Sequence, residues 1–130
     1  MAGTSAYNSA NILNWNLGAG SPTQPTAWAV GVATAAPTSV SPFELGTGTG
    51  LSRQTMPTPA AASPAGSKSN SSAMTFGPAN AGVTISGVQI WDQVASGGNM
   101  LFYGTLATAR TLASGDSLVI AAGSLVVSLA

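Results

Sequence analysis

The sequence predicts an all-β domain, an antiparallel β-sandwich or distorted β-barrel with long loops and a short N-terminal helix or arm. Short apolar segments separated by turn residues fill the last third of the chain, and several short strands at regular spacing favour a sandwich or a barrel. The middle is rich in Ala, Thr, Ser, Pro and Gly, which is typical of loops. At 130 residues we expect one domain over 1–130, with an arm at 1–25 and a β core at 26–130.

The arm is predicted to hold the only helix. Its apolar side chains cluster in one short stretch, and a Gly/Ser/Pro turn follows, so the stretch suits a short helix or turn that stops at glycine. The clustered residues are Ile12, Leu13, Trp15 and Leu17. Trp15 is a candidate interface anchor, because aromatic side chains are enriched at binding hot spots, and Leu17 beside it is a second candidate.

The β core is predicted to begin with a strand that ends near Pro37. Trp28, Val30 and Val32 alternate with small residues, which gives the strand a large face and a small face. The small face would let another backbone or sheet approach closely, or it is ordinary exposed alanine.

Long loops are expected over residues 34–82, with short strands near 53–56 and 73–76. The Gly/Thr alternation at 46–50 is expected to be a flexible turn. Long segments without regular structure are uncommon in compact domains unless they are functional or packed on a partner. We therefore expect arms that clasp neighbouring subunits.

The last third shows the strongest β pattern. Val83 and Ile85 occupy odd positions, while Val88 and Ile90 occupy even ones, so in a regular strand the two pairs would face opposite sides. Gly87 between them is therefore predicted to form a bulge or break. Residues 92–99 then form a connection and 100–103 a strand that pairs in a hairpin. Further strands are predicted at 118–120 and 125–129, after turns at 114–116 and 122–123.

The composition favours assembly. The chain has three basic and three acidic residues, 5% charged against 45% hydrophobic, whereas a soluble monomer normally has about a quarter charged residues. Much of its surface is therefore expected to be covered by partners. The basic residues Arg53, Lys68 and Arg110 lie far apart, so nucleic acid is not an expected ligand. No apolar run is long enough to span a membrane, and the first residues lack the pattern of a secretory signal, so we expect neither membrane insertion nor export by signal peptide.

The residue types present exclude large classes of chemistry. With no His and no Cys, neither a Ser-His or Cys-His apparatus nor an ordinary zinc site is possible. Glu44, Asp92 and Asp116 each lie beside turn residues, where carboxylates cap backbone groups more often than they form an acid/base pair or a calcium cluster. Lys68 lies in a polar Ser-rich stretch and is expected in a solvated loop. We expect no enzyme, no cofactor and no metal.

Arginine and tryptophan supply the remaining candidates. Arg53 and Arg110 are interface candidates that would bridge subunits, although local hydrogen bonds are the more ordinary expectation for surface arginines. Trp28 and Trp91 lie in apolar strand patterns and are expected in the core. The alternative is that both join Trp15 in a sugar-binding aromatic platform.

Taken in order, these segments resemble a family of small tailed-phage proteins, often labelled tail-fibre proteins, that includes capsid decoration or cement proteins. The resemblance covers nearly the whole chain and is strongest near the C-terminus. The matching stretches are Asn11 to Gly18, Pro25 to Thr38, Leu51 to Gln54, Gly97 to Leu106 and Arg110 to Asp116. The family often has His where this chain has Thr34, and acidic residues where it has Ala35 and Ala36.

The resemblance implies a non-enzymatic virion protein on the outer surface of the capsid. It implies a homotrimer that stabilises the shell by binding across junctions of major capsid protein subunits. A tail or tail-fibre component is the alternative within the particle. A host-surface carbohydrate-binding adhesin is an alternative from another class, and a hydrolase built on the scattered carboxylates comes last.

Overall fold

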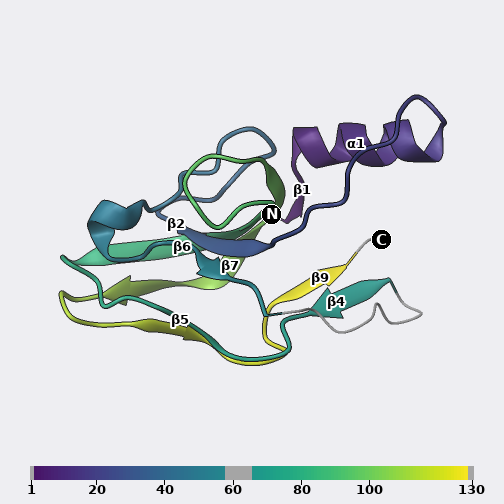
Figure 1. Ribbon diagram of the computed structural model, residues 1–130. Helices are drawn as coiled ribbons and strands as arrows, with labels where there is room; N and C mark the ends of the chain where they lie inside the picture. Colours follow the sequence, from purple (N-terminus) through teal and green to yellow (C-terminus); the bar gives the residue numbers. More distant parts are fainter. Residues whose placement is uncertain (1, 58–65, 129–130) are drawn as a thin grey trace.

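A five-stranded antiparallel sheet is the largest element of the computed structural model, which describes residues 2–57 and 66–128. Two antiparallel ribbons of two strands each accompany the sheet, and Figure 1 shows a layered arrangement with the helix standing off at one end. The sheet order is β1 (Gly3–Thr4), β7 (Met100–Leu112), β6 (Val83–Trp91), β2 (Ala29–Ala33) and β3 (Gln54–Thr55). The ribbons are β4 (Ser67–Ser69) with β9 (Val126–Ser128), and β5 (Met74–Phe76) with β8 (Leu118–Ile120). The predicted all-β class is therefore confirmed.

The main core lies against the large face of β2. Val30 and Val32 are completely buried in one cluster with Phe76 and Ile85. Burial of each such side chain contributes about 1.5–3 kcal/mol, so this cluster is the main driving force for joining the sheet to the β5–β8 ribbon.

The small face of β2 is also buried, so the exposed-alanine alternative is wrong. Ala29 packs in a second cluster with Trp91 and Met100. At Gly31, side-chain atoms of neighbouring elements approach so closely that a Cβ would lie 2.8 Å from Glu44 Oε1. Small residues are therefore needed here for close approach.

The predicted hairpin and bulge are confirmed. Strands β6 and β7 pair along their length, and the register shifts between Ile85 and Gly87. A Cβ at Gly87 would lie 2.8 Å from Pro37 Cγ and 2.9 Å from Gly104 O. The bulge thus brings the core face back into phase, and the bare glycine leaves space for the Pro37 ring.

Most of the other predicted elements are found, some with different bounds. The strand predicted at 100–103 is longer than expected, because β7 continues to Leu112. Residues 92–99 form no strand, the turns at 114–116 and 122–123 are present, and β8 has the predicted bounds. The first core strand covers only Ala29–Ala33, and the last covers Val126–Ser128, with position 129 outside the described residues. The glycine-threonine segment forms a short 3-10 turn, η1 (Thr47–Thr49).

Two strands were not expected from the sequence. The N-terminal arm contains β1, which pairs with β7, and the polar stretch around Lys68 is strand β4 rather than a solvated loop. Neither segment shows apolar alternation that would predict a strand. Each is held in the strand conformation by backbone hydrogen bonds to a strand distant in sequence. Lys68 itself remains exposed.

The single α-helix of the described chain, α1 (Ala6–Asn16), follows β1 directly. Its N-cap is Ser5, whose Oγ accepts a hydrogen bond from Asn8 N at 3.0 Å. The predicted glycine stop is confirmed: Gly18 has φ +75°, and Leu17 N donates to Leu13 O at 2.9 Å. No residue of α1 is buried.

Candidate interaction site at the N-terminal helix

The face of α1 that points away from the sheet carries an apolar stripe, which we call the outer stripe. Its members are spaced by four, three and four residues, so they lie along one side of a helix with 3.6 residues per turn. They are Ala6, Ala10 and Leu13 of the helix and Leu17, the residue that caps its C-terminal end. All four are exposed, Leu13 by 58% and Leu17 by 78%.

An exposed stripe of this kind is unusual for a helix that packs on its own domain. Surface helices normally turn their apolar side toward the core, and isolated helices shorter than about 12–15 residues are marginal in water. Here the apolar stripe faces solvent. The outer stripe is therefore an apolar surface that the described part of the chain leaves uncovered.

The helix is held to the sheet at its N-terminal end. Ser5 N donates to Leu101 O at 2.9 Å, the Ser5 hydroxyl donates to Met100 O, and Ala6 N donates to Ser39 O at 3.0 Å. Ser5 is 2% exposed, so this joint is shielded from water. The joint fixes the position of α1 relative to β7 without burying the outer stripe.

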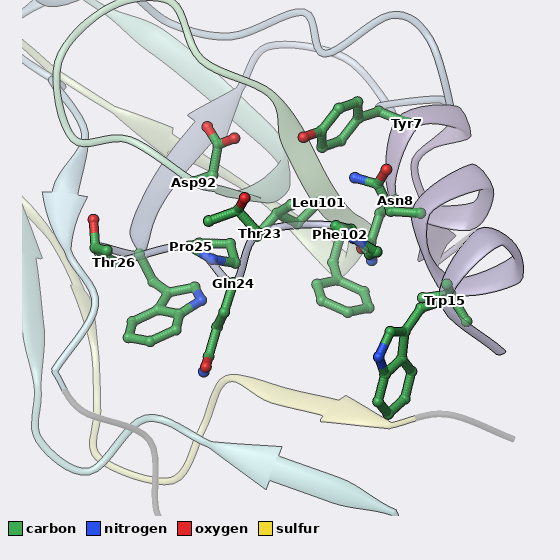
Figure 2. A pocket seen from close by; sticks show the side chains of 14 residues that line it. Tyr7, Asn8, Trp15, Thr23, Gln24, Pro25, Thr26, Asp92, Leu101 and Phe102 are labelled. Carbon is green, nitrogen blue, oxygen red and sulfur yellow. The ribbon is translucent and has the colours of Figure 1, made fainter. Parts of the chain in front are cut away.

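The opposite face of α1 borders a groove, which we call the inner groove, with a volume of about 750 Å³. Strand β7 and residues 22–26 form its other walls. Four aromatic residues line it: Tyr7, Trp15, Trp28 and Phe102. In Figure 2 the side chains of Gln24, Phe102 and Trp15 extend toward the same side of this groove, while Tyr7 and Asn8 lie at its other side.

The predicted tryptophan positions are only partly brought together. Trp15, 68% exposed, and half-buried Trp28 both line the inner groove, and Trp28 also packs on the main core. Trp91 is 7% exposed and belongs to the second core cluster, as expected. A platform of all three tryptophans therefore does not form.

Of the four interface candidates, Trp15 lies on the helix and Leu17 is its C-cap residue; both side chains are accessible, on different sides of the helix. Arg110 is exposed on β7, opposite Ile85 of β6. Arg53 is different, because its side chain is only 5% exposed. Its guanidinium group is used inside the chain, which leaves little of it for another subunit.

Arg53 organises a cluster that could not be recognised from the sequence. Its Nε and Nη2 donate to Glu44 Oε1 at 2.5 Å and Oε2 at 2.9 Å, and its guanidinium carbon lies 3.7 Å from the centre of the Trp91 ring. Its Nη1 also contacts three carbonyl oxygens at 2.7–2.9 Å, those of Gln93, Ala95 and Gly97. Glu44 thus forms an ion pair rather than the expected cap, because the isolated bridge between Ala33 and Glu44 fixes it beside β2.

The other two carboxylates have the expected capping role. Asp92 accepts from Asn99 N at 2.7 Å, and Asp116 accepts from Ala113 N at 2.9 Å. Within residues 2–57 and 66–128, acidic side chains are not grouped in a way that could hold a metal ion. In the same part of the chain, no helix has the length and apolar character needed to cross a membrane.

The architecture is that of a β-structural domain with an exposed N-terminal helix. Residues 3–128 match the family model described as "Podophage GP4 fiber I protein gp80". The chain therefore belongs to this phage fibre protein family and is a structural component of a phage particle. The resemblance to small tailed-phage structural proteins is confirmed. No curated protein matches the chain.

Proposed function

We propose that this chain is a non-enzymatic structural subunit of a phage tail fibre, attached to the particle through the outer stripe of α1. The description of its family as a fibre protein supports the tail position. The single structural observation that carries the attachment is a helix with no buried residue and an apolar stripe facing solvent.

The chemistry of the described residues supports a structural role. The sequence has no His and no Cys, and the three carboxylates are engaged separately, in one ion pair and two turns. General acid–base catalysis needs a titratable group placed beside a reacting atom. Each carboxylate here already has a partner that explains its position.

The energetics of docking fit an attachment element. Burial of an exposed leucine side chain contributes about 1.5–3 kcal/mol, and Leu13 and Leu17 are both largely exposed before assembly. If the assembled unit is a homotrimer, as the resemblance implies, three helices would bind together. Linked contacts then raise the effective concentration of each later one, so modest single contacts give firm attachment.

Capsid decoration is the second candidate. Its support is the nearly uncharged chain, with 5% charged residues, which suits a small domain covered by neighbours on a lattice. In this case the outer stripe would bind across junctions of major capsid protein subunits. Binding only to the assembled lattice would stabilise the shell by mass action.

The experiment is complementation of a phage that lacks this gene with a Leu13→Ser/Leu17→Ser variant, followed by immunoblotting of purified particles. We expect the variant to fold but to be lost from particles, because its stripe is no longer apolar. A matched control is Val40→Ser/Val119→Ser, which changes two apolar residues that are 74% and 57% exposed elsewhere on the surface. Equal incorporation of both variants would overturn the attachment by α1.

Cryo-electron microscopy of wild-type particles separates the two positions. Density for the β domain restricted to the tail, at a few copies, supports the fibre role. Density repeated over the icosahedral surface, at hundreds of copies, would replace it with capsid decoration.

A further inference from the structure

We infer that the inner groove beneath α1 is a binding site for a neutral saccharide. This goes beyond the proposed function, because it concerns the opposite face of the helix and does not depend on where the chain sits in the particle.

The aromatic lining is the first observation. The chain is only 6% aromatic, yet Tyr7, Trp15, Trp28 and Phe102 all border this one groove. Trp15 is 68% exposed and Tyr7 45% exposed, so neither ring is used to fill the core. The C–H faces of pyranose rings pack on aromatic rings, whose flat surfaces combine large contact area with little loss of side-chain freedom.

The polar lining is the second observation. Three amide side chains, those of Asn8, Asn11 and Gln24, lie among the aromatic rings. An amide both donates and accepts hydrogen bonds, as does a sugar hydroxyl, so the two match in either direction. Gln24 lines the groove from residues 22–26 and Phe102 lines it from β7, so an amide and an aromatic ring are both available to one ligand.

The charge of the groove selects a neutral ligand. Among the described residues that line it, Asp92 is the only charged one, and none of them is Lys or Arg. Both carboxylate oxygens of Asp92 already accept hydrogen bonds from Asn99, at 2.7 and 2.9 Å. An acidic sugar or a phosphate would meet a negative charge with no cation to balance it. The volume of about 750 Å³ lies within the usual range of small-molecule sites.

The test measures binding of the purified full-length chain to a panel of neutral oligosaccharides built from glucose, galactose, mannose, rhamnose and N-acetylglucosamine. Saturation-transfer NMR detects binding, and tryptophan fluorescence titration gives the affinity. Glucuronic acid oligomers and sialyllactose serve as acidic probes. We expect at least one neutral probe to bind and the acidic probes to bind at least tenfold more weakly.

Two variants locate the site. Trp15→Ala removes an exposed ring from the groove and is expected to weaken binding at least tenfold while thermal unfolding stays unchanged. Leu17→Ala changes the same helix on its outer stripe and is expected to bind sugar within twofold of wild type. Gln24→Ala tests the polar wall, with a loss of several-fold expected.

The outcomes separate this inference from the proposed attachment. Loss of sugar binding in Trp15→Ala with normal incorporation into particles supports the groove as a separate site. Absence of binding to every neutral probe, equal binding of acidic probes, or unchanged affinity in Trp15→Ala would each overturn the inference. So would a finding that Trp15→Ala abolishes self-association of the chain, because the groove would then hold a second copy.

Discussion

The guanidinium carbon of Arg53 lies 3.7 Å from the centre of the Trp91 ring, while the same group makes a two-pronged ion pair with Glu44. Stacking and bidentate pairing use the planar shape of arginine as well as its charge. Because Arg53 Nη1 also contacts carbonyl oxygens of the 92–99 connection, one side chain joins three separate parts of the fold.

Replacement of Arg53 by Ala is expected to lower the free energy of unfolding by about 3 kcal/mol or more, because it leaves Glu44 and several carbonyl groups without their partner. The midpoint of thermal unfolding should fall by about 10 °C, measured by circular dichroism. Arg53→Lys keeps the positive charge but not the planar guanidinium group, and it is expected to lower the free energy of unfolding by about half as much. The control is Arg110→Ala at an exposed position, with a change within about 0.5 kcal/mol. Equal effects of Arg53→Ala and Arg110→Ala would contradict the role of the cluster.

Gly31→Ala is expected to destabilise the protein by about 1–3 kcal/mol through overpacking. The new Cβ would lie 2.8 Å from Glu44 Oε1, 2.9 Å from Gln89 Oε1 and 3.2 Å from Trp91 Nε1. Chemical denaturation with urea measures the loss. Gly46→Ala is the matched control, since nothing lies within 4 Å of its Cβ position and its φ is −81°. An unchanged free energy of unfolding in Gly31→Ala would mean that the surrounding side chains move aside without cost.

Ser5→Ala is expected to loosen α1 and to cost about 1–2 kcal/mol, because the hydroxyl is both the helix cap and a buried link to Met100. Amide hydrogen exchange should speed up in residues 6–16 while β6 and β7 stay protected. Ser124→Ala, at an exposed turn position, should leave exchange in α1 unchanged. Uniform loss of protection over the whole chain would argue that the cap belongs to the global fold instead.

Asn70→Ala is expected to release the β4–β9 ribbon. The Asn70 side chain, in a residue 1% exposed, donates to Ser72 O at 2.8 Å and Ala121 O at 2.9 Å, and it accepts from Leu125 N at 3.0 Å. Loss of these buried bonds should cost about 2–3 kcal/mol and expose residues 121–128 to limited proteolysis. Asn16→Ala removes an exposed amide that donates to Ile12 O at 2.9 Å, and it is the control. If proteolysis is the same in both variants, Asn70 does not hold the ribbon.

The sequence was most informative where side-chain pattern alone determines structure. The change of parity around Gly87 predicted the bulge, because a period of two must slip by one residue to keep Val83 and Ile90 in contact with the core. The glycine stop of α1 and the turns of the last third were likewise local signals. Each depends on residues within a few positions of one another.

The elements that were missed depend on distant partners. Strand β4 pairs with β9 across nearly sixty residues of chain, and its Ser-Lys-Ser sequence has no apolar face to reveal it. The Arg53 cluster joins groups separated by 9 to 44 positions. At the inner groove the first turn of α1 lies next to β7, because Ser5 bonds to that strand. A single serine gives no sequence pattern from which this contact could be predicted.

The joint at Ser5 also determines how mechanical load would pass through the molecule. Tension applied at the N-terminal end of α1 reaches the domain through β1, whose residues Gly3 and Thr4 pair with Tyr103 and Phe102 of the longest strand. The hydrogen bonds of this pair and of Ser5 run across the direction of the chain, so a pull along β1 would stress them simultaneously rather than one after another. Strand β7 would share that stress with β6 along the whole hairpin. Load on this end of the helix is therefore spread over the hairpin of the two longest strands.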